Sequence, residues 1–158
     1  MTAPLLVLAW GNPSRGDDAL GPRFAEQIER WGLDGVECLV DFQLQVEHAL
    51  DLEGRRRVLF VDAARAHDWD AAECFRVRRV QASRQISCRS HAMHPEEVLR
   101  VWSILKDAAP PACWLLALRG QRFELGEEVS ELAQQCLGQA LAWAQSFLCA
   151  RSNDCLDA

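Results

Sequence analysis

Two adjacent acidic residues, Asp17 and Asp18, stand in a glycine-bounded turn near the start of the chain. The turn follows an apolar run at residues 4–9 and precedes a helix-like pattern at residues 24–28. One carboxylate in such a turn can cap the helix, because it accepts backbone N–H groups at the positive end of the helix dipole. A second acid is one more than a cap needs, since neighbouring like charges repel unless a cation or a hydrogen-bond network offsets them. The pair therefore indicates either a capped turn or a cation site.

Two further aspartates, Asp41 and Asp62, each end a predicted strand. An aspartate in this position either starts a loop through an Asx turn or faces a crevice as an acid or a ligand, and the sequence leaves both interpretations open. In an open α/β sheet the working crevice lies beyond the carboxyl ends of the strands. Asp41, Asp62 and the acidic pair after the first strand are therefore expected to converge on one rim of the sheet.

The chain has four histidines, and His91 is the best placed to reach that rim. It lies in a polar loop before a predicted helix, whereas His94 stands where that helix is capped. His48 falls in another predicted helix, with a surface or packing role, and His67 falls in a loop. Two carboxylates and one imidazole suit a transition metal such as nickel, iron or zinc better than calcium. The H-x-x-H spacing is not the i, i+4 pair of a zinc-protease helix, and no G-x-S-x-G nucleophile motif occurs.

The elements that must position these residues alternate between strands and helices. Apolar or alternating runs predict strands at residues 5–10, 36–40, 58–61, 74–80 and 113–118. The run at 74–80 is the more polar and is expected at an edge of the sheet, with antiparallel pairing as one option. Helices are predicted at residues 20–31, 46–52, 95–106 and 129–147. This order indicates a single-domain, three-layer α/β/α fold with a twisted, mostly parallel sheet of about five strands. Residues 1–150 are expected to form the domain and residues 151–158 a flexible C-terminal tail.

The composition restricts the class of protein. A length of 158 residues with 49% apolar residues suits one globular domain with its own core. The net charge of −6 argues against a nucleic-acid partner. No apolar run approaches the roughly 20 residues of a membrane-spanning helix, and no basic region precedes the first apolar run, so neither a membrane partner nor a signal peptide is expected. These features favour a cytoplasmic protein, taken as a monomer by default.

Seven cysteines occur, which is an odd number, and no pair has C-x-x-C spacing. Several of them lie inside apolar strand or helix patterns. The sequence therefore predicts reduced, mostly buried thiols of a cytosolic protein, rather than a disulfide framework or a zinc site.

Residues 11–21, with the sequence GNPSRGDDALG, resemble the G-N-x-x-x-x-D-[DE]-x-x-G signature of the hydrogenase maturation proteases. These endopeptidases trim the C-terminal extension from the large subunit of [NiFe] hydrogenases. Residues 58–63 resemble the family's second metal-ligand strand, and Ser90 with His91 resembles its histidine segment. The form DFQLQ at residues 41–45 is most similar to the branch that serves the soluble, NAD-reducing hydrogenases.

This resemblance implies roles for particular residues. The nickel-binding positions of the family fall on Asp18, Asp62 and His91, and the nickel they recognise is the ion already installed in the large-subunit precursor. Cleavage would then report that metal insertion is complete. The family often has Glu where this chain has Asp18, and a small residue commonly stands at the position of Trp10.

The chemical step is left open by the sequence. One hypothesis has the metal polarise the scissile carbonyl with water as the nucleophile. Another uses Asp41 as the general base. Two rival functions remain: a non-enzymatic nickel or small-ligand binding protein that uses the same crevice, and a phosphate-binding α/β enzyme that uses the turn at residues 11–18. The acidic rim counts against the second, because carboxylates repel phosphate unless a cation intervenes.

Overall fold

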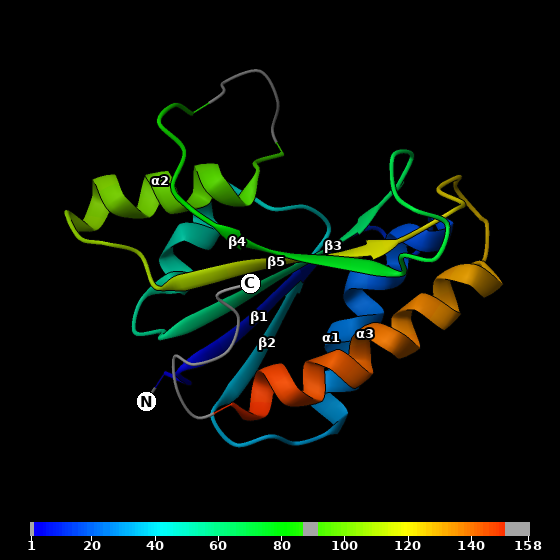
Figure 1. Ribbon diagram of the computed structural model, residues 1–158. Coiled ribbons are helices and arrows are strands. Elements are labelled where there is room, and N and C mark those ends of the chain that lie inside the picture. Colours follow the sequence, from blue (N-terminus) through cyan, green and yellow to red (C-terminus); the bar gives the residue numbers. More distant parts are fainter. Residues whose placement is uncertain (1, 87–91, 151–158) are drawn as a thin grey trace.

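The computed structural model describes residues 2–86 and 92–150, and its elements alternate along the chain as Figure 1 shows. The strands are β1 (Leu5–Trp10), β2 (Val36–Asp41), β3 (Arg57–Ala64), β4 (Phe75–Val80) and β5 (Ala112–Arg119). The α-helices are α1 (Leu20–Arg30), α2 (Pro95–Lys106) and α3 (Glu131–Cys149), and two 3-10 helices, η1 (Gly16–Ala19) and η2 (Val46–Leu52), lie between them. All five predicted strands are confirmed. The expected tail at residues 151–158 lies outside the described residues.

The strands form one five-stranded sheet in the order β2-β1-β3-β5-β4. Strands β2, β1, β3 and β5 pair in parallel, and β4 runs antiparallel to β5 at the edge. This confirms the mostly parallel sheet and the antiparallel edge strand that the polar pattern of residues 74–80 predicted. Because four strands run the same way, their carboxyl ends lie along one edge of the sheet.

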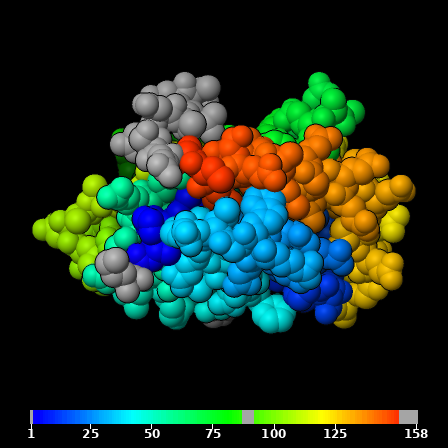
Figure 2. Space-filling model, turned by 90° about the horizontal axis from the view of Figure 1, so that it is seen from below, coloured from blue at the N-terminus to red at the C-terminus, as the bar shows by residue number. Residues whose placement is uncertain are grey.

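Helices cover both faces of the sheet, so the fold has three layers (Figure 1). Alternate residues of β1 face opposite sides: Leu5 and Val7 pack with α1 and α3, whereas Leu6 and Leu8 pack with α2 and η2. Viewed from the α1 and α3 side, the blue chain segment that includes α1 and the orange to red segment of α3 form one continuous surface (Figure 2). The continuous apolar run of β1 is therefore explained by burial on both faces.

The helix predicted at residues 46–52 is confirmed, and it is the 3-10 helix η2. The segment connects β2 to β3, and 3-10 turns are frequent in connectors, although this run of seven residues is longer than most. It places Ala49 and Leu52 in the core on the α2 side of the sheet and leaves Leu50 exposed. A helical period in seven residues cannot distinguish a 3-10 helix from an α-helix, so the sequence pattern predicted only a helix here.

The expectation of fully reduced cysteines is wrong for one pair, because Cys74 and Cys136 form a disulfide. Cys74 directly precedes β4, and Cys136 lies in α3. The two segments meet where Phe75 packs on Trp143, with 5.9 Å between ring centroids. Of the other described cysteines, Cys113 is a buried thiol, and its burial raises its pKa to about 12.

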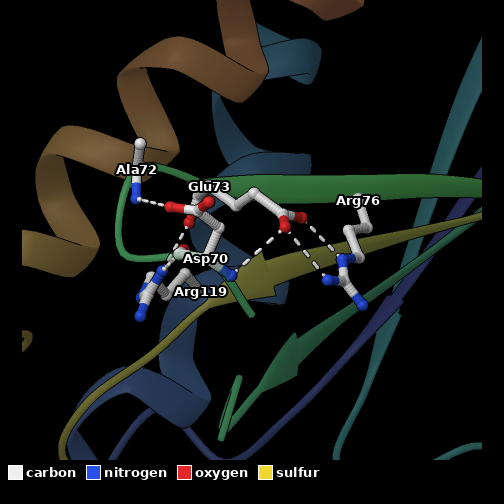
Figure 3. Close-up of polar contacts among 5 residues, drawn as sticks. All are labelled: Asp70, Ala72, Glu73, Arg76 and Arg119. Atoms are coloured by element: carbon white, nitrogen blue, oxygen red, sulfur yellow. Dashed lines mark hydrogen bonds and ion pairs between the residues drawn. The ribbon is translucent and has the colours of Figure 1, made fainter. Parts of the chain in front are cut away.

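The connection between β3 and β4 is held by a cluster of polar contacts, drawn in Figure 3. The Arg119 guanidinium, at the end of β5, donates to the backbone oxygens of Asp70 and Glu73, both at 2.8 Å. The Glu73 carboxylate accepts two hydrogen bonds from Arg76, at 2.6 and 3.0 Å, and these hydrogen bonds lower the pKa of Glu73. This cluster fixes the long β3–β4 connection against the carboxyl end of β5.

Within residues 2–86 and 92–150, no helix has both the length and the apolar character needed to cross a membrane. A surface hollow lined by residues such as Pro4, Gly35 and Arg57 lies at the amino ends of the strands. It is therefore at the opposite edge of the sheet from the predicted carboxylate rim.

Candidate functional site

The predicted rim forms at the carboxyl ends of the strands. Asp41 is the last residue of β2 and lies opposite Trp10, the last residue of β1. Asp62 lies in β3 opposite Ala117 of β5. Strand β3 continues to Ala64, so Asp62 does not end its strand as expected and does not start a loop. This rules out the loop-starting Asx turn for Asp62 and leaves its side chain on the rim as a candidate acid or ligand.

Two glycines of the turn after β1 permit the close packing that brings the acidic pair to the rim. Gly11 has φ +147°, and a Cβ at this position would overlap the backbone oxygen of Asp18. A Cβ on Gly21, in the first turn of α1, would lie 2.5 Å from the backbone oxygen of Trp10. The glycines of the motif at residues 11–21 therefore let the turn fold back on itself and let α1 start against β1.

Asp17 is fully buried and accepts four hydrogen bonds. Its donors are the backbone N–H groups of Gln121, Arg122 and Ser130 and the Ser130 hydroxyl, at 2.6 to 2.9 Å. Burial by itself raises the pKa of this carboxyl, but the hydrogen bonds from Arg122, Ser130 and Gln121 outweigh it and hold the pKa below its ordinary value. Asp17 thus ties the first turn to the loop before α3, as well as ordering the turn itself.

Asp18 has a different environment. Its Oδ2 accepts a hydrogen bond of 2.6 Å from the backbone N–H of Asn12, across the turn, and the residue is partly exposed. It does not cap a helix: the N-cap of α1 is Ala19 and that of η1 is Arg15, neither with a side-chain cap. The cap interpretation of Asp18 is therefore wrong, because the 3-10 turn η1 places this acid inside a helical turn rather than before one.

Asp62 lies in the electrostatic field of Asp18. Burial above all, together with the negative charge of Asp18, raises the pKa of Asp62 to about 7, against hydrogen bonds from the Ala63 N–H and the Trp10 side chain that lower it. The Ala63 hydrogen bond is 2.8 Å long. The carboxylates of Asp62 in β3 and Asp18 in η1 therefore repel each other at the rim when both are ionised. A divalent cation would relieve this repulsion and displace the proton of Asp62.

The third expected ligand, His91, lies outside the described residues. Within the described part of the chain, no group of three or more His, Cys, Asp or Glu side chains could hold a metal ion. Just after the gap at residues 87–91, the Met93 N–H donates a hydrogen bond of 3.0 Å to the backbone oxygen of Leu44. Leu44 lies in the segment that follows β2, so this part of the chain lies beside the rim. His94 is the N-cap of α2 in a reciprocal capping box with Glu97, which confirms its structural role.

His48 is the residue whose importance the sequence did not indicate. Its side chain is buried, and its Nε2 lies 3.3 Å from Oδ2 of Asp41. The expectation of a packing role is confirmed, but the contact with a candidate catalytic acid was missed. The signal that could have found it is the seven-residue spacing from Asp41, which lets a strand-end acid and the following helical turn face each other.

The fold is that of the hydrogenase maturation endopeptidases, which known structures share over nearly the whole chain. The hydrogenase maturating endopeptidase HybD from E. coli superposes with a TM-score of 0.71 at 20% identity, covering 91% of each chain. The [NiFe] hydrogenase maturation protease HycI from Thermococcus kodakarensis gives 0.68 at 19% identity, covering 92% of each chain. HybD from the same archaeon gives 0.66 at 16%, covering 90% of this chain and 97% of that one. No protein-family model and no curated protein sequence matches this chain.

Proposed function

We propose that this protein is an endopeptidase that removes the C-terminal extension of a [NiFe] hydrogenase large-subunit precursor after nickel insertion. The fold shared with proteins named as hydrogenase maturation endopeptidases supports the proposal. The observation that carries it in this chain is the effect of the Asp18 charge on the buried Asp62 at the rim, where burial and mutual repulsion make a cation favourable.

In this proposal the nickel belongs to the substrate. Asp18, Asp62 and His91 bind the ion that the precursor presents, so the enzyme needs no resident metal. A precursor that lacks nickel cannot make these contacts and binds more weakly. The enzyme thus distinguishes a precursor with nickel in its active site from one without it by a difference in binding free energy.

The peptide bond is cleaved by water, and Asp41 is our candidate general base. Its carboxylate takes a proton from the attacking water, and the leaving peptide nitrogen receives a proton as the C–N bond breaks. The alternative is that the substrate's nickel polarises the scissile carbonyl without a protein base. Asp41→Asn separates the two: loss of a general base lowers kcat by about 10²–10⁴ with KM little changed, whereas wild-type turnover would remove Asp41 from the mechanism.

The proposal is tested by incubating the purified protein with nickel-loaded and nickel-free precursor. Mass spectrometry of the precursor should show a shorter chain only in the nickel-loaded sample. Asp18→Asn and Asp62→Asn should reduce this cleavage, and Asp34→Asn serves as the control, because Asp34 is exposed and lies in the hollow at the opposite edge of the sheet from the rim. Binding without shortening would instead favour the non-enzymatic nickel or small-ligand binding protein.

Three finer parts of the proposal have separate tests. The DFQLQ form of residues 41–45 supports a substrate from the soluble, NAD-reducing hydrogenases, so their precursor should be cut faster than one from a membrane-bound hydrogenase. The reaction is placed in the cytoplasm, which cell fractionation checks. The protein acts as a monomer that meets its precursor transiently, and light scattering during gel filtration measures its mass in solution.

A further inference from the structure

We propose that His48 is a positioning residue that orients the carboxylate of Asp41. This inference rests on the proposed function, in which Asp41 is the general base. It concerns a contact between the carboxyl end of β2 and the first turn of η2, two elements that the chain joins through residues 42–45.

The backbone determines which nitrogen of His48 carries the proton. The Gln45 N–H donates to Nδ1 of His48 at 2.8 Å, as half of a reciprocal capping box at the start of η2. A nitrogen that accepts a hydrogen bond cannot itself carry a proton, so the ring is neutral with its proton on Nε2. Burial of the side chain, which is 10% exposed, keeps the ring in this place.

The second nitrogen lies close to the candidate base. Nε2 of His48 lies 3.3 Å from Oδ2 of Asp41, while Oδ1 of Asp41 accepts a hydrogen bond of 2.7 Å from the Phe42 N–H. The Asp41 backbone oxygen also accepts from the Gly11 N–H at 3.1 Å. Each carboxylate oxygen thus has a partner that sets the plane of the group, yet the Asp41 side chain remains 41% exposed and open to water.

This arrangement favours a role in positioning over packing alone. The capping box at η2 needs only Nδ1 of the ring. The second nitrogen lies 3.3 Å from an oxygen of a carboxylate that is 41% exposed to water. What the contact adds is a restricted orientation, and a base that rotates freely loses rate because the reacting atoms are then rarely aligned.

The geometry is tested first without precursor. A long-range ¹H–¹⁵N NMR spectrum of histidine-labelled protein, assigned by loss of the His48 signals in His48→Gln, should show Nε2 protonated and Nδ1 unprotonated. A ring protonated on Nδ1, or a mixture of the two tautomers, would overturn the inference whatever the protein cleaves.

The function of the contact is tested by a double-mutant cycle on cleavage of nickel-loaded precursor. His48→Phe keeps a planar aromatic ring but removes both nitrogens, and it should lower kcat by up to about 10²-fold, the range seen for a misplaced catalytic group. It should lower kcat no further in the Asp41→Asn background, because two residues that act as a unit are not additive. Equal losses in both backgrounds would mean a structural role and would overturn the proposal.

Two side-chain replacements act as matched controls for folding. Gln and Glu at position 48 can both accept the Gln45 N–H, which preserves the capping box. Only Gln can also donate toward Asp41, so His48→Gln should restore much of kcat and His48→Glu should not. Equal activity of the two variants contradicts positioning. If the wild-type protein leaves nickel-loaded precursor intact, the proposed function itself fails, which is a distinct result.

Discussion

At the scale of single residues, neighbouring acids in this chain have opposite roles. Asp17 is enclosed by hydrogen-bond donors, whereas Asp18 is partly exposed and faces the field of Asp62. From the sequence, the pair indicated either a capped turn or a cation site. The sequence could not predict the partners of Asp17, because they lie more than a hundred residues further along the chain.

We expect Asp17→Asn to destabilise the protein by at least about 2 kcal/mol, since hydrogen bonds to a buried charge are strong and the amide would turn a donor toward donors. Urea unfolding measures this, with the exposed Asp34→Asn as the matched control. Because folding lowers the pKa of Asp17, its stabilising contribution is present above the ordinary pKa and is lost as the pH falls through the folded value. The difference between wild type and Asp17→Asn should therefore shrink in acid; a constant difference would contradict the assignment.

Asp62 should give the opposite pH dependence. Its pKa rises from 3.8 to about 7 on folding, so the folded state holds a proton that the unfolded state has released. Between these values the metal-free protein should lose stability as the pH rises, by at most about 1.4 kcal/mol per pH unit. Chemical unfolding of wild type and Asp62→Asn across this range measures the effect. The free energy of unfolding of Asp62→Asn should fall less steeply with pH than that of the wild type. Identical slopes for the two proteins would show that Asp62 ionises normally.

At the scale of elements, close backbone contacts determine where the helices begin. The strands, α2 and the antiparallel edge could be predicted from apolar pattern, proline and charge, because these signals are local. The 3-10 form of η2 and the pairing of Cys74 with Cys136 could not, because both depend on how a segment packs against a distant one. The residues of the disulfide are 62 positions apart and share no motif.

Gly21 and Gly138 provide a matched test of helix packing. An added Cβ at Gly21 would lie 2.5 Å from the Trp10 backbone oxygen, whereas at Gly138 of α3 nothing lies within 4 Å. Gly138→Ala should stabilise the protein by up to about 1 kcal/mol through helix propensity. Gly21→Ala should destabilise it by about 1–3 kcal/mol, since α1 must move away from β1. Thermal unfolding of both variants checks this; stabilisation by Gly21→Ala would mean that the helix start is free to adjust.

At the scale of the whole molecule, parallel pairing collects side chains from separate strands on one rim. Asp41 and Asp62 reach it from β2 and β3, and Asp18 joins them from the turn after β1. This convergence follows from the fold class and was predictable. The contact of His48 with Asp41 was not, because it depends on the path of the residues between β2 and η2.

The disulfide links the edge strand to the helical layer and should contribute to the stability of the whole domain. Replacing Cys74 and Cys136 by Ser removes a cross-link that closes a loop of 62 residues, and the chain-entropy estimate for this length is about 4 kcal/mol. The unfolding midpoint of the oxidised wild type should exceed that of the double variant, and a reductant should remove the difference. Equal midpoints without reductant would mean that the two thiols stay unlinked in solution.

The order of strands across the sheet differs from their order of synthesis. Strand β5 lies between β3 and β4, although β4 precedes it in the chain. The donors that enclose Asp17 follow β5, at residues 121–130. On the ribosome, the nascent chain must therefore carry an unpaired β4 and an unsatisfied Asp17 until its last third has emerged. The surroundings of the rim are therefore completed late in synthesis. A truncated product would keep the acidic residues but would lack the residues that hold them in place.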